Sequence, residues 1–297
     1  MRAGSRRLTG LRGLGALVAV TASVAAAVVG CGAGEEDADV VVAGTAPVTP
    51  YGGPLYVPVK DVDEDGEQAV LATSGAAGRA LECDGEAYSG SHGETWSASD
   101  AGATPEDGLR LYFAIEQPDV PRSGYRAERT ENGRVLYSFD VDGRTKVAVV
   151  VAEDRKGRPG WGPETSASCD PAELPAAFTD SREYEIWTDA DGGRVPVATL
   201  SSHAGPDHCD WRSAHFLVLG RGEDSRQYVR DPEGVLDAGL LSAPYDGDAR
   251  LPPDAHDTGY RHRGRELWLR DDPSAVYVRT PDGVEAWPLA KSTIACM

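Results

Sequence analysis

The sequence predicts an α+β protein of two small, strand-dominated domains, built from antiparallel meanders with few helices. Short runs of β-branched and aromatic residues are separated by Asn132-Gly133 and Asp142-Gly143, which are typical of two-residue hairpin turns. A single strong helix start stands at Thr104-Pro105. Four of the five cysteines bound two segments of nearly equal length, which indicates one disulfide in each of two domains.

Residues 1–30 have the pattern of a signal peptide. Four arginines precede an apolar run that ends at Gly30. The sequence Val28-Val29-Gly30-Cys31 resembles a bacterial lipobox, in which cleavage leaves the cysteine as the lipid-bearing first residue. The apolar run is near the lower length limit for crossing a ~30 Å hydrocarbon core, which disfavours an uncleaved anchor. We therefore expect a lipoprotein held on the extracytoplasmic face of the cell membrane through Cys31.

Residues 31–54 are predicted to form a disordered acidic tether. The segment has little apolar periodicity and is rich in residues that solvate well.

A first α+β domain is expected at residues 55–178. Its helix should begin after Thr104 as N-cap, carry Pro105 in the first turn and end near Gln117, because Pro118 follows. The pattern then changes to an antiparallel meander. Its three predicted strands are Tyr125 to Arg129, Arg134 to Asp140 and Thr145 to Ala152.

A second, β-rich domain is expected at residues 179–297, after a break between Leu174 and Asp180. Parts of the first domain recur in it, which leaves a tandem duplication and coincidence both open. The segment Asp231-Pro-Glu-Gly234 is predicted to be a turn between strands. The matching segments are Ser123-Gly-Tyr-Arg126 with Thr258-Gly-Tyr-Arg261, Gly133-Arg-Val-Leu136 with Gly264-Arg-Glu-Leu267, and Ala148-Val149 with Ala275-Val276.

With Cys31 assigned to a lipid, an even number of cysteines remains for an oxidising compartment. Four cysteines allow three connectivities. Cys83 and Cys169 are 86 positions apart and Cys209 and Cys296 are 87 apart, and these matched separations favour those two pairs. Loops of this size correspond to at most ~4.5 kcal/mol of stabilisation per bridge.

The formal net charge is −19, and no basic patch is visible in the sequence. Such a charge repels polyanions, so nucleic acid and anionic headgroups are poor partners. We expect a cell-surface protein, or a neutral or cationic ligand, as the partner.

The sequence contains two groups of residues that are candidates for metal sites. Asp61, Asp63 and Asp65 match the opening of a calcium loop, but its twelfth position is Ala72 instead of a bidentate glutamate. A solvated acidic turn is the favoured interpretation.

His203, His208 and His215 lie close together in the sequence, as transition-metal ligands do. Cys209 between them argues against such a site, because a disulfide removes it as a ligand. We expect no metal and no cofactor.

Signatures of nucleophilic catalysis are also missing. The sequence has no Gly-x-Ser-x-Gly and no Ser-x-x-Lys motif, so no catalytic residue is assigned. A carboxylate pair of the glycosidase type leaves no local signature and stays open. The six tryptophans fit β-domain cores better than a carbohydrate-stacking face.

Several segments resemble a group of uncharacterised secreted lipoproteins of actinobacteria, for which no activity is assigned. The resemblance extends over nearly the whole mature chain, supports the lipoprotein prediction and transfers no catalytic residue. The segments are Leu81-Glu-Cys83-Asp-Gly85, Tyr137 to Lys146, His208-Cys-Asp-Trp211, Tyr228-Val-Arg-Asp-Pro232 and Leu267-Trp-Leu269.

The sequence therefore favours a non-enzymatic binding or cell-envelope interaction module, with a secreted hydrolase of envelope polymers as the alternative. A hydrolase should present a cleft in which titratable groups converge. A binding module should present an apolar or aromatic surface patch.

Replacing Cys31 with Ala should release or mislocalise the protein, because the lipid on this cysteine is the expected attachment to the membrane. Fractionation of cells into membrane and soluble material measures this. A cleaved Cys31→Ala product that stays fully in the membrane fraction would contradict the lipidation.

Overall fold

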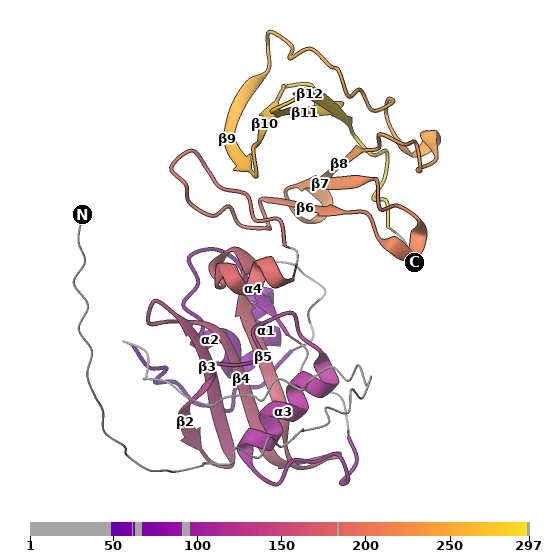
Figure 1. The fold of residues 1–297 in the computed structure, drawn as a ribbon. Helices are drawn as coiled ribbons and strands as arrows, with labels where there is room; N and C mark the ends of the chain where they lie inside the picture. Colours follow the sequence, from indigo (N-terminus) through magenta and orange to yellow (C-terminus); the bar gives the residue numbers. More distant parts are fainter. Residues whose placement is uncertain (1–48, 61, 63–66, 91–95, 183, 296–297) are drawn as a thin grey trace, which may run out of the picture. The chain divides into compact units, whose positions relative to one another are not determined.

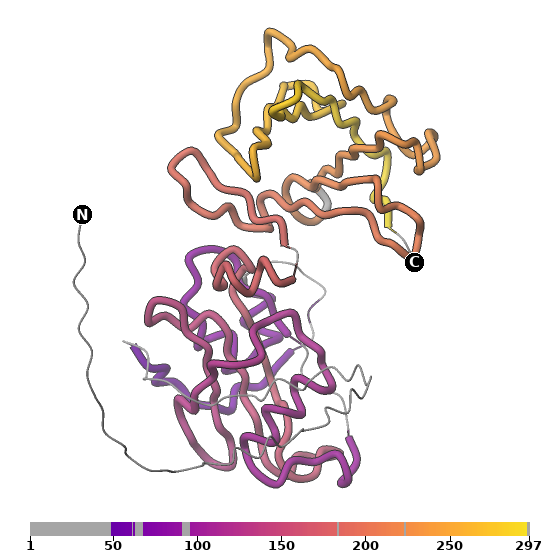
Figure 2. Tube along the Cα trace, viewed as in Figure 1, coloured from indigo at the N-terminus to yellow at the C-terminus, as the bar shows by residue number. Residues whose placement is uncertain are grey.

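The computed structural model describes residues 49–60, 62, 67–90, 96–182 and 184–295 (Figures 1 and 2). The expected signal peptide, Cys31 and most of the tether lie outside this range, as do Asp61, Asp63 and Asp65. The described chain is strand-rich and contains three antiparallel sheets. Its hydrophobic clusters fall into two groups, with members at residues 51–178 and at 187–294. We call residues 49–182 the first part and residues 184–295 the second part.

The first part is built on a five-stranded antiparallel sheet of order β1-β5-β4-β3-β2. Both predicted hairpins form. Asn132 and Gly133 have φ of 48° and 68°, and Asp142 and Gly143 have φ of 53° and 76°, the left-handed conformation that tight hairpin turns require. The predicted meander is therefore confirmed. Its strands are β1 Ala87–Ser89, β2 Arg126–Glu131, β3 Arg134–Val141, β4 Arg144–Arg155 and β5 Arg158–Cys169.

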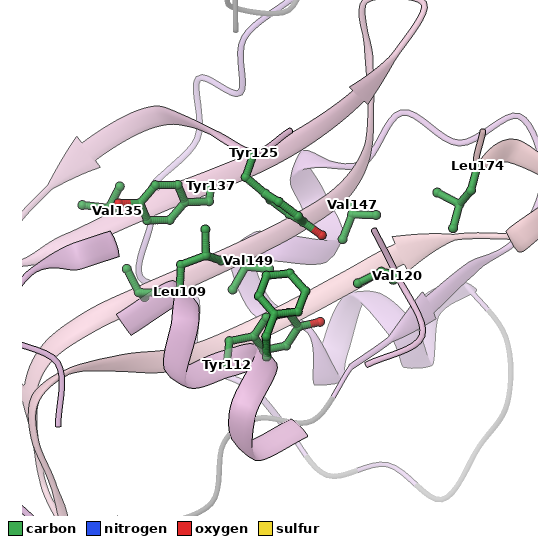
Figure 3. Close-up of a cluster of buried hydrophobic side chains, with 11 residues drawn as sticks. Leu109, Tyr112, Val120, Tyr125, Val135, Tyr137, Val147, Val149 and Leu174 are labelled. Atoms are coloured by element: carbon green, nitrogen blue, oxygen red, sulfur yellow. The ribbon is translucent and has the colours of Figure 1, made fainter. Parts of the chain in front are cut away.

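The predicted helix is α3, Pro105–Glu116, and it begins with a full capping box between Thr104 and Asp107. It ends at Gln117, which adopts the left-handed conformation with φ of 43°. Leu109, Tyr112 and Phe113 of α3 pack in one cluster with alternate residues of β4 (Figure 3). The other helices are α1 Glu67–Thr73, α2 Gly75–Ala80 and α4 Ala176–Ser181, and the 3₁₀ turns are η1 Pro171–Glu173, η2 Asp207–Cys209, η3 Gly222–Asp224 and η4 Ala238–Leu240.

Strand β4 explains the layering of the first part. Val147, Val149 and Val151 join the cluster of α3, whereas Ala148 and Val150 join a second cluster with residues of α2. Successive side chains of a strand point to opposite faces, so this strand is buried on both. The continuous apolar run from Val147 to Ala152 follows from that position.

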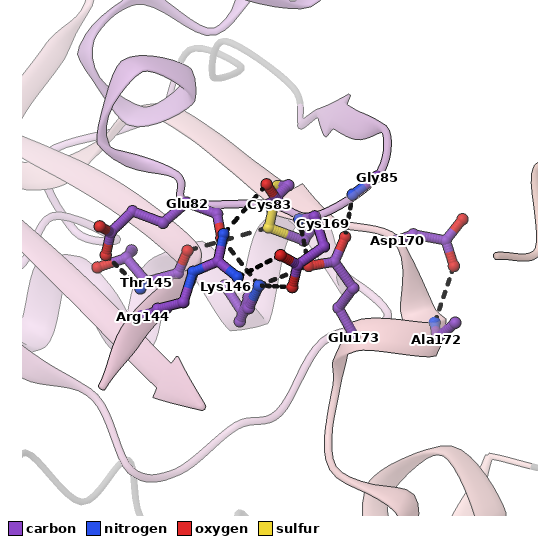
Figure 4. The surroundings of a disulfide bond; sticks show 11 residues. Glu82, Cys83, Gly85, Arg144, Thr145, Lys146, Cys169, Asp170, Ala172 and Glu173 are labelled. Atoms are coloured by element: carbon purple, nitrogen blue, oxygen red, sulfur yellow. Dashed lines mark hydrogen bonds and ion pairs between the residues drawn. A yellow bond between two sulfur atoms is a disulfide. The ribbon is translucent and has the colours of Figure 1, made fainter. Parts of the chain in front are cut away.

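A disulfide joins Cys83, just after α2, to Cys169 at the end of β5 (Figure 4). This is the first of the two pairs that the cysteine separations predict. Beside it the buried ammonium of Lys146 donates to the carbonyl of Glu82 at 2.8 Å, to Asp84 at 3.1 Å and to Glu173 at 2.5 Å. The buried cation is therefore fully paired, as burial requires.

The second part contains two antiparallel sheets, of order β6-β7-β8 and β12-β11-β10-β9. A bridge between Tyr228 and Leu289 joins β8 to the end of β12, and residues of both sheets share one core cluster. Residues 231–234 form the predicted turn. The strands are β6 Leu200–Ala204, β7 His215–Leu219, β8 Arg226–Arg230, β9 His256–His262, β10 Arg265–Leu269, β11 Ala275–Thr280 and β12 Gly283–Pro288. Within the described range, no helix is long and apolar enough to cross a membrane.

Peptide mapping without reduction should recover Cys83 linked to Cys169 and Cys209 linked to Cys296. The structure contains the first bridge and shows Cys209 disulfide-bonded, while Cys296 lies outside the described residues. Recovery of a peptide that links Cys209 to any cysteine other than Cys296 would contradict the second pairing.

Candidate functional site

A hollow of about 390 Å³ in the second part is surrounded by polar side chains from five strands. Glycines and short polar residues of two turns form its rim, namely Gly247, Thr280, Asp282 and Gly283. Its wall consists of His215 on β7, Arg230 on β8, Arg265 on β10, and Glu285 and Trp287 on β12.

Strand register explains why these side chains meet. His215 and Arg230 are direct partners in the β7–β8 pairing, so their side chains share one face of that sheet. His262 and Arg265 are direct partners in the β9–β10 pairing. Glu285 and Trp287 are two residues apart on β12 and therefore also point the same way.

The carboxylate of Glu185 connects the two sheets on one side of the hollow. It accepts hydrogen bonds from Nε2 of His215 at 2.8 Å, from Arg265 at 3.1 Å and from the hydroxyl of Ser202. Ser202 itself accepts from the indole N–H of Trp187 at 2.9 Å. Because Nε2 of His215 donates to Glu185, a neutral His215 keeps its lone pair on Nδ1.

These contacts determine the charge of the groups involved. Burial raises the pKa of Glu185, but hydrogen bonds from His215 and Ser202 and the positive charge of Arg265 outweigh it and hold this pKa far below 4.5. Burial lowers the pKa of His262, and the nearby carboxylate of Glu185 opposes this shift without cancelling it. Because a guanidinium can only donate, Nδ1 of His262 accepts from Arg265 at 3.3 Å.

A second ion pair completes the wall of the hollow. Nε of Arg230 lies 2.9 and 3.2 Å from the two oxygens of Glu285, which also accepts from the indole N–H of Trp287 at 2.8 Å. Burial raises the pKa of Glu285, and the hydrogen bonds from Arg230 and Trp287 lower it further than burial raises it. The guanidinium of Arg230 lies 5.7 Å from the ring centre of Tyr245.

The three candidate metal ligands His203, His208 and His215 do not converge on one point. In the β6–β7 register His203 pairs with Phe216 and Ala204 pairs with His215, so His203 and His215 point to opposite faces. His203 stacks on Phe216 with 5.3 Å between ring centres, and His208 is exposed in η2. Only His215 belongs to the hollow.

Among the described residues, one group has the spacing of metal ligands: Cys83, Cys169 and Glu173. Its two sulfurs form the disulfide, which leaves no thiolate to bind a metal. The groups around the hollow are instead held by one another.

Sequence reasoning missed Glu185, Arg230, Arg265 and Glu285. Each stands in a different segment, and the folding of two sheets brings them together, so no local spacing marks them. The one signal in the sequence is a charged residue alternating with buried apolar residues, as in Glu285-Ala286-Trp287 and Arg265-Glu266-Leu267.

The tryptophans at this site belong to the core, as the sequence predicts. Trp187 and Trp287 are fully buried. In the described part of the chain the large hydrophobic side chains that are exposed are Tyr56, Val59 and Val62. They lie in one short segment of the first part, away in sequence from the hollow.

A second hollow, of about 370 Å³, is mainly apolar and is lined by residues that include Tyr88, Tyr112 and Tyr184. Its polar groups pair with one another. Tyr88 donates to Asp170 at 3.2 Å, and Tyr184 donates to Asp119. Titratable groups from separate sheets converge only on the first hollow of these two.

Comparison with protein-family models, curated proteins and solved structures finds no match to this chain.

Replacing Glu185 with Gln should destabilise the protein by about 2–4 kcal/mol at pH 7, because His215 and Arg265 lose a charged partner in a partly buried site. The folded pKa of Glu185 lies below its unfolded value of 4.5, so its contribution is present above pH 4.5 and is lost as the pH falls. The difference between wild type and variant should therefore shrink in acid.

Urea unfolding at pH 7 and at pH 3 measures this effect. Glu233→Gln, at an exposed position of the turn formed by residues 231–234, is the matched control and should change stability by less than about 0.5 kcal/mol. A Glu185→Gln difference that is the same at both pH values would contradict the assigned ion pair.

Proposed function

We propose that this protein is a lipid-anchored, extracytoplasmic binding module whose second part holds a small polar ligand in the hollow beside His215, Arg230 and Arg265. The observation that carries the proposal is the convergence of ion-paired side chains from two sheets on one open hollow. Small-molecule sites commonly combine such a concavity with a few fixed polar groups.

The proposed location of the protein is argued mainly from the sequence. The lipobox at Cys31, the disulfide between Cys83 and Cys169 and the resemblance to actinobacterial lipoproteins all agree with a secreted, membrane-attached protein. The acidic tether would separate the folded part from the lipid surface. A cell-surface protein remains a candidate partner, and the net charge disfavours nucleic acid.

We further propose that the chain is of the α+β class with two domains, at residues 55–178 and 179–297, which arose by duplication of a four-stranded meander. The order β5-β4-β3-β2 corresponds to β12-β11-β10-β9. The turn glycines occupy equivalent places: Gly133 lies between β2 and β3 with φ of 68°, and Gly264 lies between β9 and β10 with φ of 81°. Gly124 and Gly259 share a positive φ, of 89° and 80°, although Gly124 precedes β2 and Gly259 lies within β9.

A secreted hydrolase is the second candidate, and one contact favours it. The 2.8 Å hydrogen bond from Nε2 of His215 to Glu185 is an arrangement that orients a histidine as a general base. Turnover of a glycan, peptide or ester that disappears in a folded His215→Gln variant would establish this candidate instead.

The low-molecular-weight fraction of envelope extracts should raise the melting temperature of the purified full-length protein. A ligand at ten times its Kd adds about 1.4 kcal/mol, or roughly 3–5 °C for a chain of this size. Thr280→Trp should fill the hollow and abolish the shift.

The control for this experiment is Thr130→Trp, on the exposed face of β2 in the first part, which should keep the full shift. Retention of the shift in Thr280→Trp would place the ligand elsewhere and contradict the proposed function.

A further inference from the structure

We infer that the ligand of the hollow is a small anion that presents a carboxylate or phosphate group to Arg230 and Arg265. This inference rests on the proposed function, which makes the hollow the ligand site, and it adds the chemical class of the ligand. The argument is a balance of hydrogen-bond donors and acceptors around the hollow.

The two ion-paired carboxylates beside the hollow, those of Glu185 and Glu285, are already engaged, whereas the carboxylate of Asp282 on the rim is not engaged by any described residue. A carboxylate offers about four lone-pair positions. Glu185 receives hydrogen bonds from Ser202, His215 and Arg265. Glu285 receives them from Nε of Arg230 and from the indole N–H of Trp287. Most lone-pair positions of Glu185 and Glu285 are therefore occupied by donors of the protein.

The donors are in excess. Each guanidinium has five N–H groups and does not lose its proton in proteins. Arg230 directs its Nε at Glu285, and Arg265 directs Nη2 at Glu185 and His262. The Nη1 of Arg265 lies 3.2 Å from Nε2 of His215, whose proton already points to Glu185. The phenolic oxygen of Tyr245 is a further acceptor for Arg230. The N–H groups that then remain need acceptors from water or from a ligand.

The two arginines are also accessible. The side chains of Arg230 and Arg265 are 34% and 21% exposed, whereas those of Glu185 and Glu285 are 14% and 13% exposed. A ligand entering the hollow past the rim residue Asp282 therefore meets the guanidinium groups before it meets the carboxylates of Glu185 and Glu285. Oxygens of a carboxylate or phosphate match the planar fork of arginine with two parallel hydrogen bonds.

The net charge of the whole chain, −19, favours a cationic ligand, but its effect on a small ligand in the hollow is limited by distance. Charges separated by more than about 8 Å are largely screened at physiological salt, so a small anion experiences mainly the hollow. A polyanion would have to bring further charges close to an acidic surface. Free small anions are thus favoured over anionic polymers.

One rim residue provides a test by gain of binding. Asp282 is exposed, lines the hollow and directs only its backbone N–H, to Thr280, among the hydrogen bonds described. Its negative charge opposes an anion in the hollow. Asp282→Asn removes this repulsion without touching either ion pair, and should tighten anion binding by about threefold.

The experiment titrates the full-length protein in detergent with inorganic phosphate, acetate, ethylammonium and a linear polyphosphate, followed by calorimetry. Phosphate or acetate should bind, and ethylammonium should not. Arg230→Lys, which keeps the charge but loses the planar fork, should weaken anion binding about tenfold with the fold intact by circular dichroism. Asp142→Asn, in a hairpin turn of the first part, removes the same charge and should change nothing.

Binding of ethylammonium without phosphate or acetate would overturn the inference. An anion affinity that is unchanged in both Asp282→Asn and Arg230→Lys would also overturn the inference, because the anion would then bind at another site. If polyphosphate binds more tightly than phosphate, the inference is wrong about size, and the ligand is an anionic polymer. In each of these cases a ligand shift that Thr280→Trp abolishes would leave the proposed function standing, whereas a shift that persists in Thr280→Trp would contradict the proposed function as well.

Discussion

A carboxylate taken out of water must be surrounded by donors, and in the second part of the chain the carboxylate of Glu185 imposes this requirement on both sheets. Its partners come from β6, β7 and β10, so the ion pair can form only when the two sheets lie together. The same contacts orient His215 and Arg265 toward the hollow. The geometry of the site is therefore a consequence of how one buried charge is neutralised.

The first part handles buried charge differently. Lys146 is enclosed by Asp84, Glu173 and a backbone carbonyl beside the disulfide, and Arg134 is paired with Glu164 at 2.5 Å. These groups are satisfied by one another.

Guanidinium atoms without a hydrogen-bond partner in the described chain also occur in the first part, at Nε of Arg122 and Nη1 of Arg126, but those atoms are buried. The guanidinium groups of Arg230 and Arg265 line a hollow and are partly exposed, and this access distinguishes them from the buried ion pairs.

Local features of the fold were predictable from the sequence. The hairpins at Asn132-Gly133 and Asp142-Gly143 and the capped start of α3 depend on residues only a few positions apart. The separation of Cys83 and Cys169 indicated their pairing because similar spacings recur along the chain. Each of these signals can be recognised in the sequence without knowledge of the tertiary structure.

The candidate site was not predictable in the same way. Proximity in sequence grouped His203 and His215, whereas the alternation of strand residues sends them to opposite faces. The true neighbours of His215 are Glu185 and Arg265, which are 30 and 50 positions away and meet it through sheet packing. Only the register between strands, which single residues do not specify, brings them together.

The sequential order of the strands has a consequence for how the chain acquires its structure. In both meanders each strand pairs with its neighbour in sequence, so these contacts have low contact order and can form quickly as the chain emerges. The exception is β1, which pairs with β5 across about 80 residues, at the same edge where Cys83 meets Cys169. The disulfide between Cys83 and Cys169 therefore stabilises the β1–β5 pairing, which is the pairing expected to form most slowly in the first part. In a reducing environment β1 would be free to separate from β5 while the other strands of the meander stay paired.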